Sequence, residues 1–184
     1  MRRHAHAALL ALALLPPTAH GADYRIDSAH SQATFSTHLL WREILGRFSR
    51  IDGTLRDGPQ AGSVVVDARI DVASLSADTP ASRRRMLAPE FFDAAQFPLI
   101  HFVSDPFPLA TLERGGALPG RLSLRGVTAP VRFTLQPLHC APAACRVVLV
   151  GQLQRSTFGM TSLRAIVSDH VELRLDIALQ TVPH

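Results

Sequence analysis

The chain has 184 residues, of which 47% are hydrophobic and 18% are charged, a composition that excludes a disordered protein and suits one globular domain. Its formal net charge is +4, and none of its 19 basic residues is a lysine. Two of these charges lie within residues 1–22, so residues 23–184 carry a net charge of only +2. Because this part contains no basic stretch interleaved with aromatic residues, we expect no nucleic-acid partner.

Residues 1–22 are predicted to be a secretory signal peptide. Arg2 and Arg3 precede an apolar run over residues 7–15, which is followed by two prolines and then by small residues. We expect cleavage after Gly21 or Ala22, which leaves residues 23–184 as the mature domain. The apolar run is well short of the roughly 20 residues that span a bilayer, so it does not predict a retained membrane anchor.

The first half of the mature chain is predicted to form strands over residues 24–38, 46–57 and 63–72, because apolar and polar residues alternate there. Residues 39–45 join two of these strands but are too apolar for an ordinary loop. We interpret Leu40 and Trp41 as a lid over a barrel mouth or as a tip that touches a membrane. The alternative is a loop folded back onto the core.

One short helix is predicted from Pro80 to just before Pro89. Thr79 can cap its start, and proline suits the first helical position. A further short turn is expected over residues 89–94. The adjacent arginines 83–85 fan out by about 100° each on a helix, which favours a solvated face over a flat patch attracted to anionic lipid.

The second half is predicted to form strands over five segments, which are residues 98–106, 109–118, 121–125, 131–136 and 146–157, and a last and clearest strand over residues 171–180. Cys140 and Cys145 lie between two of these strands. In an oxidising compartment we expect a disulfide across that turn. A metal site is the rival interpretation, but it would need more ligands than His139.

These elements predict an all-β protein, a closed antiparallel lipocalin-like barrel of about eight strands with one short helix. Closure removes exposed strand edges, and a barrel of this size can hold one small ligand. Apolar inward faces imply an apolar ligand. The alternative is that the same side chains simply fill the barrel.

No catalytic residue, metal or cofactor is predicted. Asp27, His30 and Ser31 lie within five residues at the start of a strand, where neighbours point to opposite faces and cannot converge as a triad. We expect His30 to be a hydrogen-bonded structural residue or a contact for a ligand head group. The spacing of His38 and His101 matches no metal motif.

Five blocks of the sequence, in order, resemble the YceI family of exported lipocalin-like proteins. They are Tyr24-Arg-Ile-Asp-Ser-Ala-His-Ser31 with Phe35, Gly46-Arg-Phe48 with Gly53, Glu90-Phe-Phe-Asp93 continuing to Phe97-Pro-Leu-Ile-His-Phe102, Gly120-Arg-Leu-Ser-Leu-Arg-Gly-Val-Thr-Ala-Pro-Val131, and Arg155-Ser-Thr-Phe-Gly-Met160 with Val167-Ser-Asp169. The resemblance implies a barrel with a long apolar tunnel that holds a polyisoprenoid, an isoprenoid quinone or a fatty-acid-like chain in the periplasm. It also implies a homodimer.

The inward faces of the predicted strands supply the candidate tunnel lining. These residues are Phe35, Phe48, Val66, Ile70, Phe102, Leu122, Leu124, Val131, Phe133, Leu149, Leu153, Phe158, Leu173, Leu175 and Ile177. His30, His38 and Arg155 are candidate contacts for a polar head group. For Arg155 an ion pair with Asp169 is the equal alternative.

The predicted function is that of a non-catalytic carrier or sequestering protein for a long-chain isoprenoid or acyl lipid, with transient membrane contact. Two alternatives remain. One is a filled barrel that acts as a structural or partner-binding module, and the other is a lipid-modifying enzyme such as a hydrolase.

Overall fold

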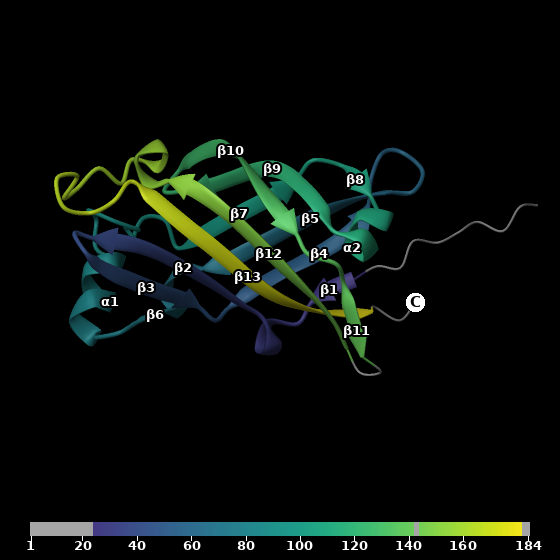
Figure 1. The fold of residues 1–184 in the computed structure, drawn as a ribbon, viewed down its shortest axis with the longest axis horizontal. Helices are drawn as coiled ribbons and strands as arrows, with labels where there is room; N and C mark the ends of the chain where they lie inside the picture. Colours follow the sequence, from purple (N-terminus) through teal and green to yellow (C-terminus); the bar gives the residue numbers. More distant parts are fainter. Residues whose placement is uncertain (1–23, 142–143, 182–184) are drawn as a thin grey trace, which may run out of the picture.

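The computed structural model describes residues 24–141 and 144–181. Within these residues, thirteen strands join in one antiparallel sheet that closes into an elongated barrel (Figure 1). The strands are β1 (Tyr24–Ile26), β2 (Gln32–Leu39), β3 (Arg42–Phe48), β4 (Ile51–Asp57), β5 (Ser63–Asp71), β6 (Leu75–Ala77), β7 (Leu99–Ser104), β8 (Phe107–Pro108), β9 (Gly116–Leu124), β10 (Val127–Leu135), β11 (His139–Ala141), β12 (Ala144–Gln154) and β13 (His170–Thr181).

The barrel wall has eight positions, because three of them are each built from two consecutive strands. The first position is formed by β1 and β2, the second by β3 and β4, and the third by β5 and β6. Both β1 and β2 pair with β13. β4 pairs with β1 and with β5, and β3 pairs with β2 and with β6. The remaining wall strands β7, β9, β10, β12 and β13 pair in chain order. β13 then meets the first position again, so the predicted eight-stranded antiparallel barrel is confirmed.

Short 3-10 turns interrupt two of these composite strands. The carboxylate of Asp27 accepts a hydrogen bond from the N–H of Ala29 and begins η1 (Ser28–His30) between β1 and β2. Asp71 caps η2 (Val72–Ser74) in the same way between β5 and β6. An aspartate that bonds its own backbone two residues on competes with the strand ladder, which explains why the predicted strand 24–38 is broken.

Two α-helices occur in the described chain, one toward each end of the barrel (Figure 1). The helix α1 (Pro80–Leu87) begins as predicted, with the Thr79 side chain accepting from the N–H of Ser82 at 3.0 Å. The predicted strand 109–118 is wrong. Its first part is the helix α2 (Ala110–Arg114), which ends at Gly115 with φ of 76°, and β9 starts only afterwards. A further 3-10 turn, η3 (Arg155–Phe158), follows β12.

The segment predicted as an apolar loop over residues 39–45 is a hairpin between β2 and β3, with Leu40 and Trp41 at its turn. The predicted disulfide between Cys140 and Cys145 is confirmed, and the two residues are register partners in the β11–β12 hairpin. The predicted signal peptide lies outside the described residues.

Candidate functional site

A cavity of about 500 Å³ runs along the inside of the barrel. The inward side chains of β13 line it from Val171 to Leu179 at every second residue. Because a strand rises about 3.3 Å per residue, this run of lining side chains spans about 26 Å. The space is therefore long and narrow, and suits an extended ligand better than a compact one.

Several side chains that point into the barrel are only half-buried. They are Val66, Ile70, Phe102, Leu153, Leu173 and Leu175, and all of them line the cavity. An inward side chain in a filled core would lose nearly all its exposed surface to its neighbours. These residues retain surface because they face open space, so the barrel holds a cavity and not a filled core.

The cavity is closed at the end where α2 lies. Leu112 of α2 is 4% exposed, and the lining residues near it, Leu55, Leu118 and Leu135, are equally buried. At this end the side chains pack against one another as in an ordinary core. A ligand chain that enters the barrel would stop here.

The opposite end of the cavity is open. Three lining residues there are exposed on the molecular surface, with Leu45 at 47%, Leu163 at 37% and Ile166 at 39%. This end is bordered by the β2–β3 hairpin, by the loop that follows η3, and by α1 with the segment after it. We call it the open end.

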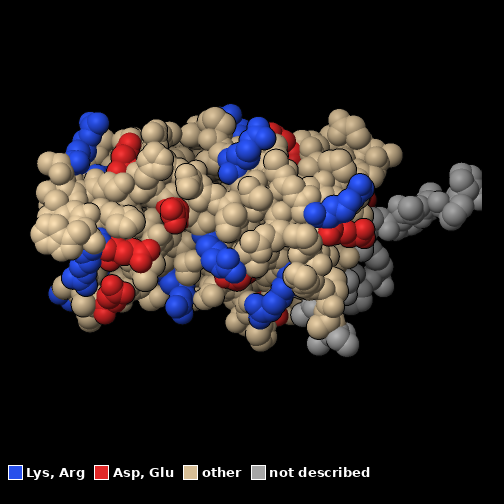
Figure 2. Space-filling model, viewed as in Figure 1, with Lys and Arg blue, Asp and Glu red and all other residues tan. Residues whose placement is uncertain are grey.

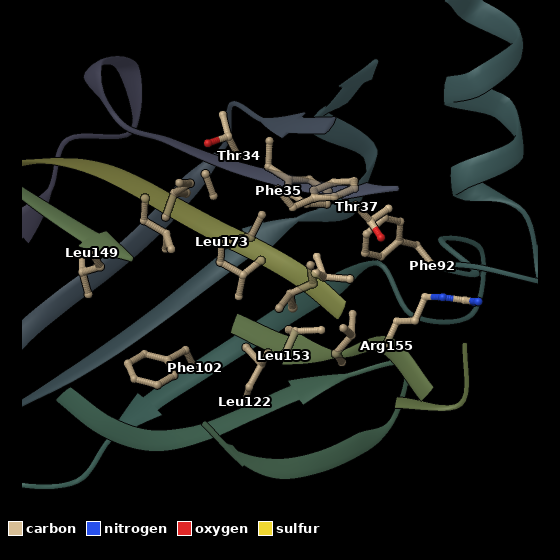
Figure 3. Close-up of a pocket in the computed structure, with 18 of the residues that line it drawn as sticks. Thr34, Phe35, Thr37, Phe92, Phe102, Leu122, Leu149, Leu153, Arg155 and Leu173 are labelled. Atoms are coloured by element: carbon tan, nitrogen blue, oxygen red, sulfur yellow. The ribbon is translucent and has the colours of Figure 1, made fainter. Parts of the chain in front are cut away.

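Aromatic rings occupy two places in the cavity wall. Phe102 and Phe133 pack edge to face with their centroids 5.3 Å apart. Near the open end, Phe92 packs edge to face against both Phe35 and Phe48, at 5.6 and 5.4 Å. Figure 3 shows Phe92 and Thr37 at the end of the cavity where Arg155 lies, with Leu149 and Phe102 further toward the other end.

Few polar groups line the cavity, and the charged ones gather at the open end. Thr37 is buried, and its hydroxyl donates to the carbonyl oxygen of His170 at 2.9 Å. The charged lining residues other than Arg155 belong to the β2–β3 hairpin, to the end of β6 and to α1. They are Arg42, Glu43, Asp78 and Arg85. The cavity thus combines an apolar interior with charged side chains at its open end.

Arg155 is buried beside the cavity, and its guanidinium is held by the protein itself. Its N–H groups donate to four backbone carbonyl oxygens, which belong to Met160, Ser162, Val167 and Ser168, at 2.6 to 3.1 Å. Four of the five N–H donors of an arginine are therefore used. The main role of Arg155 is to fold the loop beside the open end.

The carboxylate of Asp169 is hydrogen-bonded to Ser156 and forms no direct ion pair with Arg155, whose charge attracts it only at longer range. It accepts from the backbone N–H of Ser156 at 2.8 Å and from its hydroxyl at 2.6 Å. The hydroxyl hydrogen bond is the main cause that holds the pKa of Asp169 below its ordinary value of 3.8. Burial acts in the opposite direction on this carboxylate, and it lowers the pKa of Arg155.

The match to the YceI-like domain family extends over residues 24–179, which is nearly all of the described chain. The chain belongs to the YceI-like family. Among curated relatives, a UPF0312 protein of Shewanella denitrificans is 34% identical over 139 residues, which are 71% of each chain. A UPF0312 protein of Vibrio cholerae is 31% identical over 67% of each chain.

Solved structures of this family have the same fold. BcnA of Burkholderia cenocepacia superposes with a TM-score of 0.72 at 20% identity, covering 83% of this chain and 98% of that one. A polyisoprenoid binding domain from Saccharophagus degradans superposes with a TM-score of 0.67 at 16% identity, covering 88% of this chain and 100% of that one. At these identities the likeness concerns the fold.

The structure places most of the sequence-predicted lining residues of this YceI-like barrel along the cavity. They are Phe35, Phe48, Val66, Ile70, Phe102, Leu122, Leu124, Phe133, Leu149, Leu153, Leu173, Leu175 and Ile177. Val131 and Phe158 lie elsewhere. Both border a small hollow at η3. Phe158 is buried in the hydrophobic core, and Val131 packs against that core from the same face of β10 as Phe133.

The two histidines predicted as head-group contacts do not line the cavity. His30 is exposed and its ring nitrogen lies 2.7 Å from the carboxylate of Asp27, so it belongs to the η1 turn. Ser31 faces the other way and accepts from the N–H of Ala178. His38 is exposed because it alternates with the inward residues of β2.

Leu40 and Trp41 do not cover the cavity as a lid, and they are not folded back onto the core. Trp41 is 89% exposed and Leu40 is 54% exposed, at the tip of the β2–β3 hairpin. Neither borders the cavity. Of the three predicted arrangements, only an exposed tip agrees with the structure.

Sequence reasoning missed the residues that form the two ends of the cavity. Leu112 was assigned to a strand, and Met86 and Phe92 were assigned to a helix and a turn with no link to the lining. Leu163 and Ile166 lie in a loop without alternation. The paired Phe91-Phe92, flanked by Glu90 and Asp93, was the one available signal that this segment packs inward.

No three His, Cys, Asp or Glu side chains among residues 24–141 and 144–181 gather closely enough to hold a metal ion. No helix in that part of the chain is both long and apolar enough to cross a membrane.

Proposed function

We propose that this protein binds a long-chain isoprenoid or a similarly long acyl lipid inside the barrel and shields it from water, without chemical conversion. The observation that carries the proposal is the row of inward side chains that remain half-buried around a cavity of about 500 Å³. A structural neighbour described as a polyisoprenoid binding domain, from Saccharophagus degradans, supports the same ligand class.

The physical driving force is the burial of apolar chain. Each methylene removed from water contributes about 0.8 kcal/mol, so ten of them supply about 8 kcal/mol before the costs of association and ordering. The volume lies within the roughly 300–1,000 Å³ of ordinary ligand sites. The charged side chains at the open end would then contact a polar head group, while the apolar chain extends toward α2.

We further propose that the protein acts in the periplasm after export. The N-terminal sequence with Arg2, Arg3 and the apolar run over residues 7–15 supports this location. The disulfide between Cys140 and Cys145 also supports it, because such bonds persist in oxidising compartments. Tracking a tagged full-length chain by cell fractionation in a Gram-negative host tests the location.

The proposed binding is tested by blocking the cavity at its middle. Leu173 faces the cavity from β13, and Leu153 faces it from β12. We expect Leu173→Trp and Leu153→Trp each to weaken the binding of an octaprenyl quinone or a long-chain fatty acid at least about tenfold, because the indole occupies the path of the chain. Native mass spectrometry and titration of the purified protein measure this.

Matched controls come from the outer faces of the same strands. Glu172 and Gln152 are register partners, exposed, and each is next in sequence to a blocked position. We expect Glu172→Trp and Gln152→Trp to bind like the wild type. Wild-type protein that binds neither quinone nor fatty acid would contradict the proposal and favour a structural or partner-binding barrel.

A further inference from the structure

Two segments project side by side at the open end. One is the β2–β3 hairpin tip, and the other is the loop from Thr161 to Val167. The N–H of Leu40 donates to the carbonyl oxygen of Ile166 at 2.8 Å, and the N–H of Ser168 donates to that of His38 at the same distance. Leu39 and Val167 form an isolated bridge. We call these two linked segments the rim.

The rim exposes a cluster of large apolar side chains. It comprises Leu40 (54% exposed), Trp41 (89%), Leu163 (37%) and Ile166 (39%), with Leu45 of β3 (47%) next to it. Most of the large apolar side chains that stand exposed in the described chain belong to this cluster. In Figure 2, uncharged atoms likewise form the extremity of the molecule at this end, with charged side chains above and below them. Large apolar clusters of this kind mark interaction sites.

Arginines accompany the apolar residues on both segments. Arg42 follows Trp41 and Arg164 follows Leu163, and both are exposed. Arg85 of α1 is exposed beside the cavity as well. Acidic side chains lie beside these arginines as well. Asp78 lies 4.0 Å from Arg42, Glu43 follows Arg42 in sequence, and the carboxylate of Asp169 is attracted to Arg164.

We propose that the rim docks on an anionic membrane surface, with Trp41 and its apolar neighbours in the interfacial layer and Arg42, Arg85 and Arg164 against lipid phosphates. Tryptophan is favoured at the membrane interface, and guanidinium groups bind phosphate in a bidentate manner. Leu163 and Ile166 belong to both the rim and the cavity wall. An apolar chain could therefore pass between bilayer and barrel without crossing water.

A second copy of the chain fits this surface less well. A two-fold contact through the rim would place two copies of the same arginine-rich surface against each other, which opposes association. It would also cover the entrance to the cavity. Docking on a bilayer instead leaves the entrance facing the phase in which a long-chain lipid is dissolved. The inference rests on the proposed function only for the role of docking, which is to let a lipid chain pass between bilayer and barrel. Docking and lipid uptake themselves are measured separately.

Trp41 is the only tryptophan of the chain, so its emission reports on the rim alone. We expect phosphatidylethanolamine–phosphatidylglycerol vesicles to shift this emission to the blue and to carry the protein in flotation. Pure phosphatidylcholine vesicles and high salt should weaken both effects. Trp41→Ser should lower vesicle affinity about tenfold or more, and Arg164→Gln about fivefold. Trp41→Phe should retain most of it.

Three controls separate the outcomes. Arg146→Gln removes an exposed arginine on β12 beside the disulfide hairpin, far from the rim, and should leave docking unchanged. Leu173→Trp should dock like the wild type although its cavity is blocked, and Trp41→Ser should still bind octaprenyl quinone supplied in detergent. Absence of flotation and of the emission shift would overturn the inference. So would a dimer that Trp41→Ser dissociates, which would assign the rim to a second copy.

Discussion

At the scale of single residues, the loop after η3 is held by two charged groups that bond backbone. Arg155 gathers four carbonyl oxygens of the loop, and Asp169 accepts from the N–H and hydroxyl of Ser156. Hydrogen bonds to charged groups are stronger than neutral ones. The conformation of this loop therefore depends on the ionised forms of both side chains.

The lowered pKa of Asp169 predicts how this part of the structure responds to acid. A carboxylate whose pKa in the folded state is below the ordinary 3.8 stabilises the fold fully above that value. Its contribution is lost as the pH falls through the folded pKa. We expect Asp169→Asn to lower the free energy of unfolding at neutral pH by about 1 kcal/mol. This difference from the wild type should shrink below a pH of about 3.8.

Urea unfolding of both proteins from neutral pH down to about pH 2 checks this expectation. Asp105→Asn, at an exposed position on the loop after β7, is the control and should follow the wild type throughout. A difference that keeps its size down to the lowest pH would show that the charge of Asp169 does not contribute.

At the scale of elements, glycines on one strand make room for phenylalanine rings on the next. Phe35 is the register partner of Gly46, and Phe133 is the register partner of Gly151. A Cβ added at Gly151 would lie 2.7 Å from Cδ1 of Phe133. The ring of Phe133 is 4% exposed and packs edge to face on Phe102 in the cavity wall. These pairs fix where aromatic rings enter the cavity.

We expect Gly151→Ala to lower the free energy of unfolding by about 1–3 kcal/mol, because the ring of Phe133 must move in a packed wall. Phe133→Val lacks the two ring atoms that the new Cβ would meet. In that background Gly151→Ala should cost much less, so a double-mutant cycle measured by urea unfolding should give a coupling energy of about 1 kcal/mol or more. Additive effects would rule out the proposed packing conflict.

The sequence predicted the wall of the barrel well because alternation reports which face of a strand is buried. The alternate positions of β13 from Val171 to Leu179 all line the cavity. It failed where local bonding competes with the strand, as at η1, and where a short helix holds Leu112 against the barrel end.

The candidate site was predictable along its walls and not at its ends. Wall positions repeat every second residue, whereas the ends are formed by α2, by Phe92 and by the loop that Arg155 folds. Their contacts are set by how the closed barrel brings distant segments together, and no spacing in the sequence records this. His38 is a different case, because alternation from Phe35 already makes Thr37 the inward residue and His38 an outward one.

At the scale of the whole molecule, the apolar cavity lets a ligand bound inside the barrel stabilise the fold. Side chains that line empty space lack packing partners on one side, and a bound chain restores them. A ligand that binds only the folded protein stabilises it by about 2.7 kcal/mol at a free concentration of one hundred times its Kd. For a domain of this size, that corresponds to a rise in Tm of roughly 5–11 °C.

We therefore expect octaprenyl quinone at that concentration to raise the Tm of the wild type by this amount, as followed by circular dichroism. Glu172→Trp, which changes only the outer face of β13, should respond equally. Leu173→Trp should show almost no response, because the indole already fills the space that the ligand would take. An equal rise in Tm for Leu173→Trp would mean that the quinone stabilises the protein from outside the barrel, and would contradict the cavity as its site.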